Sequence, residues 1–489
     1  MILVQLNQEN FEYDIHSLVK AFYPTENISV CVDHKENAEP VRLYLLVCYE
    51  PGNIRLELKE PDPPISGSPQ SLQRVFAVDD NDRKETKNLL KMNLYSVLSE
   101  YTGQTLPWGT LTGIRPTKIP MTMLAAGKTS EDITNYMKNT YATSLEKIGL
   151  SIEIARRETE LLRKLDVKEG YSLYIGIPFC PSTCLYCSFT SFPISVWKKR
   201  MDDYLNALEK EIDDIARRFA GRQLDTIYIG GGTPTTLEPE QLDRLLSVLE
   251  QKLDLSHLVE YTAEAGRPDS ISRDKLEVLR AHGISRISIN PQTMKQETLD
   301  LIGRHHTVAQ ITDSFLLARS MGFDNINMDL IMGLPEETLD DVRHTFERIR
   351  ELDPDSVTVH SLALKRAARL QMQKEDYQGL TMINTQQHLD VAADICAQMG
   401  MTPYYLYRQK NMAGNFENVG YAKDGKAGIY NILIMEEKQT IVACGAGSVS
   451  KRVYPDGRIE RSENVKDVSQ YIERIGEMIE RKKHLLCDC

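Results

Sequence analysis

The sequence predicts an α/β fold: a partial (β/α)6 TIM-like barrel with an N-terminal α+β domain and a small C-terminal domain. Between residues 171 and 399, short apolar runs alternate with longer amphipathic stretches. Such alternation implies βαβ units and a parallel sheet. The alternation is absent before about residue 165 and breaks down after about residue 400. We therefore expect three domains, at 1–165, 166–400 and 401–489.

The first domain combines β-rich runs with helical patterns. Four runs have the composition of strands, and they lie at 28–34, 41–50, 53–60 and 73–80. A charged amphipathic stretch near 83–101 predicts a helix, and further helical patterns extend to about residue 165. A loop rich in turn formers, 106–120, separates these two helical regions.

The barrel is predicted from six candidate strands and the helical patterns that follow them. The strands are 171–177, 225–229, 259–264, 285–289, 325–332 and 356–360. The helical patterns lie near 196–218, 239–253, 270–282, 306–321, 338–352 and 379–399. Six such units suit an incomplete TIM-like barrel, in which sites form at the C-terminal ends of the strands. Periodicity alone also allows a doubly wound sheet.

The third domain is predicted from segments rich in glycine and tyrosine. Two apolar runs, 428–437 and 439–445, predict a pair of strands. A basic amphipathic stretch near the C-terminus predicts a final helix.

Composition excludes several classes of function. The net charge of -12 argues against broad non-specific nucleic-acid binding, which needs a positive field. No apolar run approaches the roughly 20 residues needed to span a bilayer, and the first residues do not form a signal peptide. We therefore expect a cytoplasmic protein without nucleic-acid or membrane partners. Nine cysteines in a reducing compartment indicate metal or redox chemistry more than disulfides.

Three cysteines follow the first predicted barrel strand directly. Cys180, Cys184 and Cys187 form a C-x3-C-x2-C pattern within one loop. Thiolates are the natural ligands of iron–sulfur clusters. A cubane has four irons, so three protein ligands leave one iron open for chemistry, as catalytic zinc sites keep one position open. The alternatives are a structural zinc site with a distant fourth ligand and three unrelated buried thiols.

The cysteine pattern, with Tyr186 just before its last member, is similar to the hallmark of radical S-adenosylmethionine (SAM) enzymes. The resemblance implies a [4Fe–4S] cluster whose open iron is chelated by the amino and carboxylate groups of SAM. One electron from the reduced cluster would cleave SAM into methionine and a 5′-deoxyadenosyl radical. A reductant such as flavodoxin or ferredoxin would then be a partner.

Further motifs at the ends of the predicted strands resemble the SAM site of the same enzymes. Gly230–Pro234 resembles the glycine motif that holds the SAM amino group, and 283–292, 301–306 and 327–335 resemble three further family segments. In the family, Gln292 would face SAM, Arg304 its carboxylate, and Asp329 its ribose. The SAM-binding residues implied by the resemblance are Tyr174, Gly231, Gly232, Thr233, Glu264, Gln292, Arg304, Asp329 and Ala363.

The GGGTP form of the glycine motif resembles the oxygen-independent coproporphyrinogen-III oxidase-like family, and the loop 108–118 resembles its HemZ-type coproporphyrinogen dehydrogenases. The resemblance implies oxidative decarboxylation of coproporphyrinogen III to protoporphyrinogen IX. Phe189 stands where characterised oxidases carry a further cysteine. Related haem chaperones and haem-degrading methyltransferases are therefore alternatives, with haem as their tetrapyrrole. The chaperones' H-N-x-x-Y-W segment is poorly matched by Glu417–Ala422.

A tetrapyrrole with four carboxylates needs cationic partners, which arginine supplies well. The candidates that the sequence offers are Arg115, Lys118, Lys365, Arg366, Arg369, Arg408 and Lys410. The terminal Cys487 and Cys489 could relay electrons or bind metal, or have no catalytic duty. His305 and His306 could suggest a metal pair, but adjacent side chains on a helix diverge.

Overall fold

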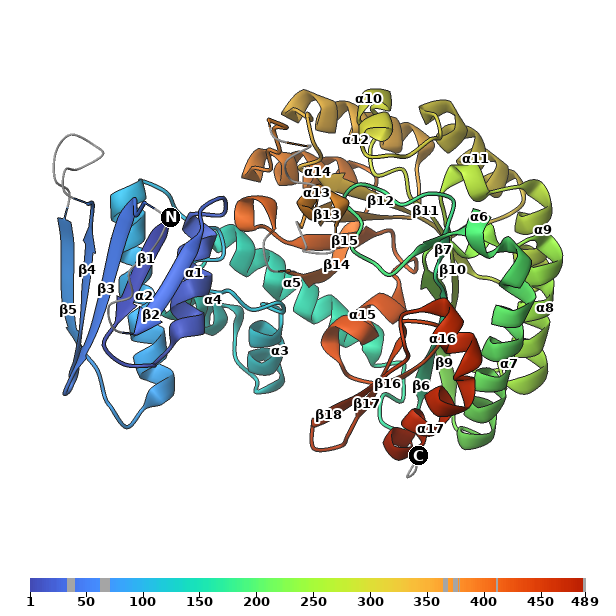
Figure 1. The fold of residues 1–489 in the computed structure, drawn as a ribbon, viewed down its shortest axis with the longest axis horizontal. Helices are drawn as coiled ribbons and strands as arrows, with labels where there is room; N and C mark the ends of the chain where they lie inside the picture. The colour runs from blue at the N-terminus through green and yellow to red at the C-terminus, as the bar shows by residue number, and fades with distance from the viewer. Residues whose placement is uncertain are drawn as a thin grey trace. The chain divides into compact units, whose positions relative to one another are not determined.

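The computed structural model divides the chain into two compact units (Figure 1). It describes residues 1–32, 40–61, 71–363, 368–372, 377, 379–409 and 412–486. Unit 1 comprises Met1–Glu153 with Arg408–Phe416, and unit 2 comprises Ile154–Tyr407 with Glu417–Cys489. The predicted domain boundaries near residues 165 and 400 stay predictions.

Unit 1 is built on a five-stranded mixed sheet in the order β2-β1-β3-β4-β5. Its strands are β1 (Ile2–Leu6), β2 (Ile28–Val32), β3 (Leu43–Glu50), β4 (Asn53–Lys59) and β5 (Ser71–Ala77). Four of these strands were predicted, whereas β1 and the helix α1 (Glu12–Phe22) were not. Together α1 and α2 (Arg83–Thr102) bury one core with the sheet, to which Val4, Leu18 and Leu94 contribute.

Three more helices follow in this part of the chain: α3 (Lys118–Ala125), α4 (Ser130–Tyr141) and α5 (Leu145–Leu162). Helix α4 begins at a reciprocal capping box, in which the Thr129 hydroxyl accepts from Asp132 N–H and the Asp132 carboxylate accepts from Thr129 N–H. Such caps satisfy backbone donors that a helix cannot pair internally.

Unit 2 contains the predicted parallel strands, and all six are confirmed. They are β6 (Tyr171–Ile177), β9 (Leu224–Gly231), β10 (Glu260–Gly266), β11 (Arg286–Ile289), β12 (Ile326–Met332) and β13 (Ser356–Ser361). They pair in chain order within one sheet, each parallel to the next. Most of their residues are buried on both faces, as expected where helices cover a parallel sheet.

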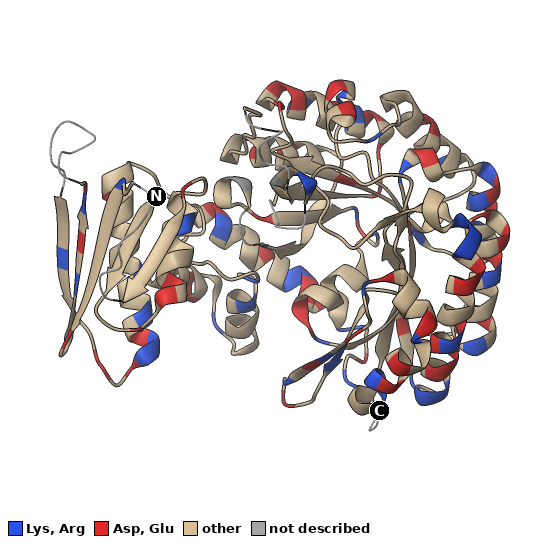
Figure 2. Cartoon of the chain, viewed as in Figure 1, with Lys and Arg blue, Asp and Glu red and all other residues tan. Residues whose placement is uncertain are grey.

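The helices of unit 2 form an outer layer around these strands (Figure 1). They include α7 (Met201–Arg218), α8 (Pro239–Lys252), α9 (Arg273–Ala281), α11 (Val308–Ser320), α12 (Leu339–Leu352) and α14 (Gln386–Gln398). Charged residues of both signs, blue and red, lie along this outer layer, whereas the strands inside are largely tan (Figure 2). The predicted α/β fold, with six parallel strands in chain order and helices outside them, is therefore confirmed.

The strands after residue 400 extend the same sheet at both of its edges. Strands β15 (Asn418–Ala422) and β14 (Thr402–Tyr407) join antiparallel beyond β13. Strand β16 (Thr440–Cys444) pairs parallel with β6 and leads to β17 (Val449–Val453) and β18 (Ile459–Glu463). Helices α16 (Val468–Glu473) and α17 (Ile475–Leu486) complete this region.

The prediction of a strand over 428–437 is wrong, because Ile429–Glu436 forms helix α15. Its buried side chains are Tyr430, Ile432, Leu433 and Glu436. A short apolar run buried on several sides cannot be assigned to helix or strand by periodicity alone. The neighbouring run, 439–445, is the predicted strand and forms β16. In the described part of the chain, no helix has the length and apolar character to cross a membrane.

Candidate functional site

The three predicted cluster cysteines lie in the loop that follows β6. Short strands β7 (Phe179–Cys180) and β8 (Phe192–Pro193) pair at its base. Cys184 is buried, Cys180 and Cys187 are half-buried, and all three are free thiols. Among the described residues, no three His, Cys, Asp or Glu side chains are arranged to hold a single metal ion.

The thiols lie close enough to influence one another. Burial, together with smaller contributions from the neighbouring Cys184 and Cys180, raises the pKa of Cys187 to about 11. Burial also raises the pKa of Cys180, which Cys184 raises again. Binding of a metal or cluster would release these protons, because only thiolates are ligands. Three mutually interacting thiols on one loop fit a cluster with three protein ligands.

Main-chain contacts anchor this loop to the turn after α10 (Gln296–Leu301). Leu185 N–H donates to Ile302 O over 2.9 Å, and the Ser182 hydroxyl donates to Gly303 O over 3.1 Å. On its other side, Leu370 N–H donates to Leu185 O over 3.0 Å. The loop that carries the thiols is therefore attached to segments more than a hundred residues away.

The predicted glycine motif lies directly beside this loop. Gly232 N–H donates to Ile177 O over 2.8 Å, and a Cβ atom at Gly232 would lie 2.5 Å from Phe179 O. Gly231 has φ +113, a conformation that favours glycine. The Thr233 hydroxyl donates to Cys180 Sγ over 3.6 Å. These contacts allow the turn to approach the thiols closely.

Glu264 lies on β10 with its carboxylate against the glycine turn. Tyr228 Oη donates to Glu264 Oε1 over 2.6 Å. Burial raises the pKa of Glu264 to about 7, although the hydrogen bonds from Tyr228 and Gly231 lower it. The carboxylate is therefore poised to lose its proton near neutral pH when a cationic or donating ligand arrives.

Gln292 and Asp329 are joined through the main chain. Gln292 N–H donates to Asp329 O, and Gln292 O accepts from Ile331 N–H, each over 3.0 Å. Gln292 itself has φ 70, an unusual conformation for a non-glycine residue. Asn327 Nδ2 donates to Asp329 Oδ1 over 2.7 Å. Burial raises the pKa of Asp329, but His360 and Asn327 outweigh it and hold the pKa below its ordinary value.

Arg304 brings a buried guanidinium next to the cysteine loop. It donates to Asn290 O and, over 3.3 Å, to Tyr186 Oη. Burial lowers its pKa, but Tyr186 and Cys184 outweigh burial and raise it. Among the described residues, its Nε has no hydrogen-bond partner. A buried donor without a partner suits an anionic ligand.

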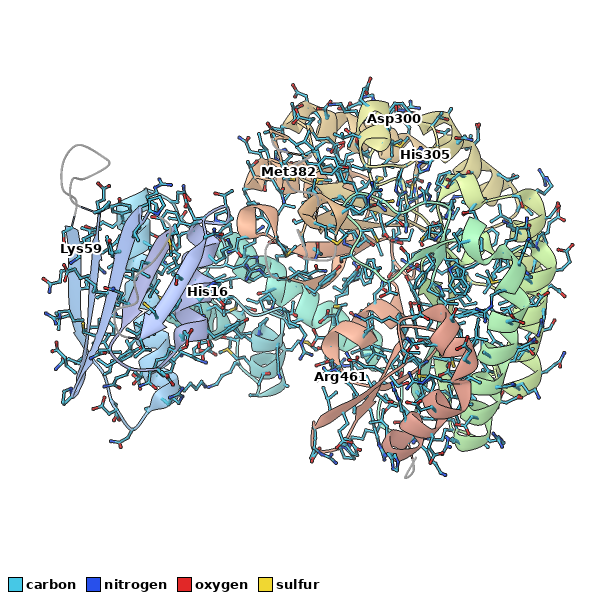
Figure 3. The ribbon with its side chains drawn as sticks, in the orientation of Figure 1. His16, Lys59, Asp300, His305, Met382 and Arg461 are labelled. Carbon is cyan, nitrogen blue, oxygen red and sulfur yellow. The ribbon has the colours of Figure 1, made fainter. Side chains whose placement is uncertain are left out.

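The predicted site residues are thus linked to one another through contacts. A Cβ atom at Gly231 would lie 3.3 Å from Tyr174 Oη, which links the first strand to the glycine turn. Ala363 is half-buried just past β13, at the same strand ends. His305 is exposed in the loop after α10 (Figure 3), whereas its neighbour His306 is buried.

Sequence reasoning missed four side chains of this region: Tyr228, His360, Tyr430 and Arg267. Tyr228 packs with Tyr174 and Tyr430, whose ring centroids lie 6.2 and 4.5 Å from its own and 6.3 Å from each other. Side chains alternate between the two faces along β9, so Tyr228 lies on the same face as Gly230 of the predicted glycine motif. This alternation could have identified Tyr228 from the sequence. His360 ends a predicted strand, where barrel sites form. No comparable signal pointed to Tyr430, since its segment was assigned to a strand.

Some predicted substrate cations can be located and others cannot. Lys365, Arg366, Lys410, Cys487 and Cys489 lie outside the described residues. In unit 1, the buried Arg408 guanidinium donates to Leu111 O and to the main-chain and side-chain oxygens of Asn415. Lys118 is exposed and Arg115 is half-buried.

Sequence and structure comparisons agree with this geometry. Residues 174–349 match the radical SAM superfamily. The oxygen-independent coproporphyrinogen-III oxidase-like protein HemZ of Bacillus subtilis (strain 168) is 40% identical over 425 residues, which cover 85% of each chain. The heme chaperone HemW of the same organism is 34% identical over 309 residues, covering 63% of this chain and 76% of its own.

A solved structure is also similar. The coproporphyrinogen III oxidase HemN from Escherichia coli, described as a radical SAM enzyme, superimposes with a TM-score of 0.51 and 26% identity. The match covers 66% of this chain and 73% of that one. Fold and site together define a radical SAM protein, a class that uses a [4Fe–4S] cluster and SAM. Within that class, the chain belongs to the oxygen-independent coproporphyrinogen-III oxidase-like family.

Proposed function

We propose that the chain decarboxylates coproporphyrinogen III to protoporphyrinogen IX without oxygen. The observation that carries the proposal is the set of ionisable groups at the ends of the parallel strands. Arg304 lies beside Tyr186 and Cys184 of the cysteine loop, and Glu264 and Asp329 lie close enough to influence each other. The similarity to the HemZ protein across most of both chains supports the same reading.

Cys180, Cys184 and Cys187 would be the cluster ligands in this proposal. When bound, the cluster and SAM supply a 5′-deoxyadenosyl radical through one-electron reductive cleavage. The backbone of Gly231 and Gly232 would bind the polar end of SAM. A side chain at Gly232 would clash with Phe179, so the turn needs glycine there to lie against the cysteine loop. Arg304 would bind a carboxylate through its unpartnered Nε.

The remaining predicted residues would orient the nucleoside part of SAM. Asp329, whose pKa is held low, would accept hydrogen bonds from the ribose hydroxyls as a carboxylate. Tyr174, Thr233, Gln292 and Ala363 would line the same site. Glu264 would accept a hydrogen bond from a donating group of SAM, with Tyr228 holding the carboxylate in place.

The reaction balances for each propionate. A hydrogen atom would leave the β-carbon of the propionate and be taken up by the radical that the cluster and SAM would supply. The carboxylate then departs as CO2, one electron passes to a one-electron acceptor, and a vinyl group remains. Two such events convert two propionates and consume two SAM molecules. A flavodoxin or ferredoxin is the proposed donor of the electrons that cleave SAM.

The propionates of the substrate would be bound by exposed cations. In unit 2, the exposed residue Arg369 on α13 (Arg369–Met372) is the candidate for this contact. Arg408 is a poor candidate, because its guanidinium already donates to protein oxygens.

A haem chaperone is the second candidate, and the HemW relative favours it. One observation weakens it. The segment that would correspond to the chaperone's haem motif, Glu417–Ala422, lies largely in β15, an interior strand of the sheet. Its Asn418 is buried and accepts from Ser361 N–H over 2.8 Å. Both features suit a structural strand more than an exposed haem ligand.

One experiment separates the candidates. The cluster is reconstituted under anaerobic conditions, and the protein is given SAM, a reductant, an electron acceptor and coproporphyrinogen III. The proposal expects vinyl product, CO2 and 5′-deoxyadenosine in matched amounts. Tight haem binding without turnover would support the chaperone, and a methylated linear tetrapyrrole formed from haem would support a methyltransferase. Either result would contradict the decarboxylase.

A further inference from the structure

Arg267 contacts the cysteine loop although no motif of the sequence pointed to it. It lies in the loop just after β10 and is 3% exposed. Its guanidinium forms a two-pronged pair with Asp269: Nε donates to Oδ1 over 3.0 Å, and Nη2 donates to Oδ2 over 2.7 Å. The fork geometry leaves one terminal nitrogen, Nη1, directed away from Asp269.

That nitrogen binds the cysteine loop. Arg267 Nη1 lies 3.1 Å from Ser182 O, 2.9 Å from Ser182 Oγ and 3.8 Å from Cys184 Sγ. The contacted atoms belong to the loop between the first and second cysteines. A single buried cation therefore holds the loop and donates toward one of its sulfur atoms.

Asp269, the partner of Arg267 in this fork, is itself held by its surroundings. Burial raises the pKa of Asp269, but the hydrogen bonds and charge of Arg267 outweigh it and hold that pKa below its ordinary value. His306 Nδ1 lies 3.9 Å from Asp269 Oδ1, and the His306 side chain is fully buried. An arginine fixed at two nitrogens keeps its third nitrogen in place with little further loss of conformational entropy.

A fixed cation beside a cluster ligand has an electrostatic consequence. One-electron reduction adds negative charge to a cluster and its thiolates. Hydrogen bonds to the sulfurs and nearby positive charge stabilise the reduced form and raise the reduction potential. The effect is large where water is excluded, because the local dielectric constant is low.

We propose that Arg267 is a positioning residue that orders the cysteine loop through Ser182 and raises the reduction potential of the bound cluster through Cys184. This inference rests on the proposed assignment of Cys184 as a cluster ligand. The simpler alternative is an arginine that only stabilises the loop. The two differ in one readout, since a purely structural arginine would leave the potential of a correctly bound cluster unchanged.

The chain offers a matched control on α7. Arg218 makes the same kind of fork with Asp214, from Nε to Oδ2 over 2.6 Å and from Nη2 to Oδ1 over 3.2 Å. R218Q removes one cation and breaks one fork without touching the cysteine loop. R267Q removes the cation from the loop, and R267K keeps a charge but loses the fork.

The first measurement is the midpoint potential of the reconstituted full-length protein, followed by EPR at fixed potentials. R267Q should shift the midpoint to lower potential than the wild-type protein, R267K should shift it less, and R218Q should not shift it. If R267Q does not retain a cluster, R267K carries the test, because a lysine ammonium cannot hold the fork with Asp269 and also donate toward Cys184. An unchanged midpoint in a cluster-containing R267Q protein, or in R267K where R267Q has no cluster, would overturn the proposal.

The second measurement uses the protein without its cluster. Hydrogen exchange of amides in residues 180–187 should become several-fold faster in R267Q and stay unchanged in R218Q. Equal exchange in wild-type and R267Q proteins would overturn the ordering role. Failure of the ligand assignment is distinguishable, because it would appear as a cluster retained by C184S, whatever Arg267 does.

Discussion

Unit 2 contains two groups of buried charge that differ in how well their atoms are paired. The Glu211 network consists of Glu211, Gly445, Asn464, Tyr471 and Lys482. Glu211 accepts from Gly445 N–H over 2.8 Å and from Tyr471 Oη over 2.6 Å, and also from Asn464 and Lys482. Both oxygens of this carboxylate are therefore satisfied by donors from distant segments.

The Arg267 cluster, which consists of Arg267, Asp269, Arg304 and His306, is less completely paired. Among the described residues, Arg304 Nε and both ring nitrogens of His306 have no hydrogen-bond partner. In the Glu211 network, only Asn464 Oδ1 is left without one. Both groups thus contain buried charge, although Asp269 itself is exposed. Unsatisfied buried atoms next to the cysteine loop distinguish the Arg267 cluster from the Glu211 network.

The comparison teaches which observation points to a site. A satisfied buried ion pair commonly has a structural role, and removing one partner is costly because a charge is left unpaired. Unsatisfied buried donors need a ligand or carry a standing cost. We therefore expect substitutions in the Glu211 network to reduce stability, and substitutions around the cysteine loop to reduce function.

The largest effect on function is expected from C184S. Removal of one thiolate should abolish cluster binding and SAM cleavage, because serine is a poor ligand for iron–sulfur clusters. The measurements are iron and sulfide content, visible absorbance and 5′-deoxyadenosine formation. C444S is the control, since Cys444 is buried in β16 and is not a predicted ligand.

A C184S protein that kept its cluster would contradict the ligand assignment. A protein that lost its fold as well as its cluster would contradict the comparison, because the thiol group would then be structural. The midpoint of urea unfolding without cluster should therefore change little in C184S.

The largest effect on stability is expected from K482M. Lys482 is 1% exposed and pairs with the equally buried Glu211. Its loss leaves an unpaired buried carboxylate, which should lower the free energy of unfolding by about 3–5 kcal/mol. Urea unfolding followed by circular dichroism tests this.

The double variant E211Q/K482M sharpens the result. It should recover part of the lost stability, because no charge is left alone in the interior. The folded K482M protein should still bind a cluster. A K482M protein of wild-type stability would show that the network does not support the fold.

Glu264 should behave in the opposite way. Burial raises its pKa from 4.5 to about 7, so the folded protein keeps a proton that the unfolded chain loses. This contribution to stability is complete below about pH 4.5 and is lost as the pH rises through 7. At about 1.4 kcal/mol for each pKa unit, the loss is up to roughly 3 kcal/mol.

E264Q should therefore be more stable than the wild-type protein at pH 8 and similar to it at pH 4.5. The pH dependence of urea unfolding, measured without cluster or SAM, gives the comparison. A smaller slope should remain, because burial also raises the pKa of Glu337 to about 7. Equal pH profiles for E264Q and wild-type proteins would show that the pKa of Glu264 is not raised in the folded protein.

The barrel could be predicted from sequence because its signals are local. Strands β6 and β9 to β13 are apolar runs separated by amphipathic helices. Helices α11 and α12 follow the caps Thr307 and Thr338, whose hydroxyls accept from the N–H of the third helical residue. Helix α15 was mistaken for a strand because its short apolar segment is buried. Strand β1 and helix α1 were missed because both lie before residue 28, where the first predicted strand begins.

The sequence predicts only those parts of the site that follow from parallel strands, whose C-terminal ends lie along one edge of the sheet. Glycine and cysteine motifs at successive strand ends must approach one another in such a sheet. Arg267 could not be identified, because its role depends on a tertiary contact with Ser182, 85 residues earlier. Tyr228 depends in the same way on the pairing of β9 with β10.

The smallest effect is expected from Y228F, and it tests the carboxylate itself. Loss of the 2.6 Å hydrogen bond from Tyr228 should raise the pKa of Glu264, because that bond favours the ionised form. More Glu264 is then protonated at pH 7, and SAM binding should weaken by roughly fivefold, or about 1 kcal/mol. At pH 9 the carboxylate ionises even without the hydroxyl, so most of the defect should disappear. Calorimetric titration of reconstituted protein at the two pH values measures this. A defect of equal size at both would mean that Tyr228 contacts SAM directly and does not act through Glu264.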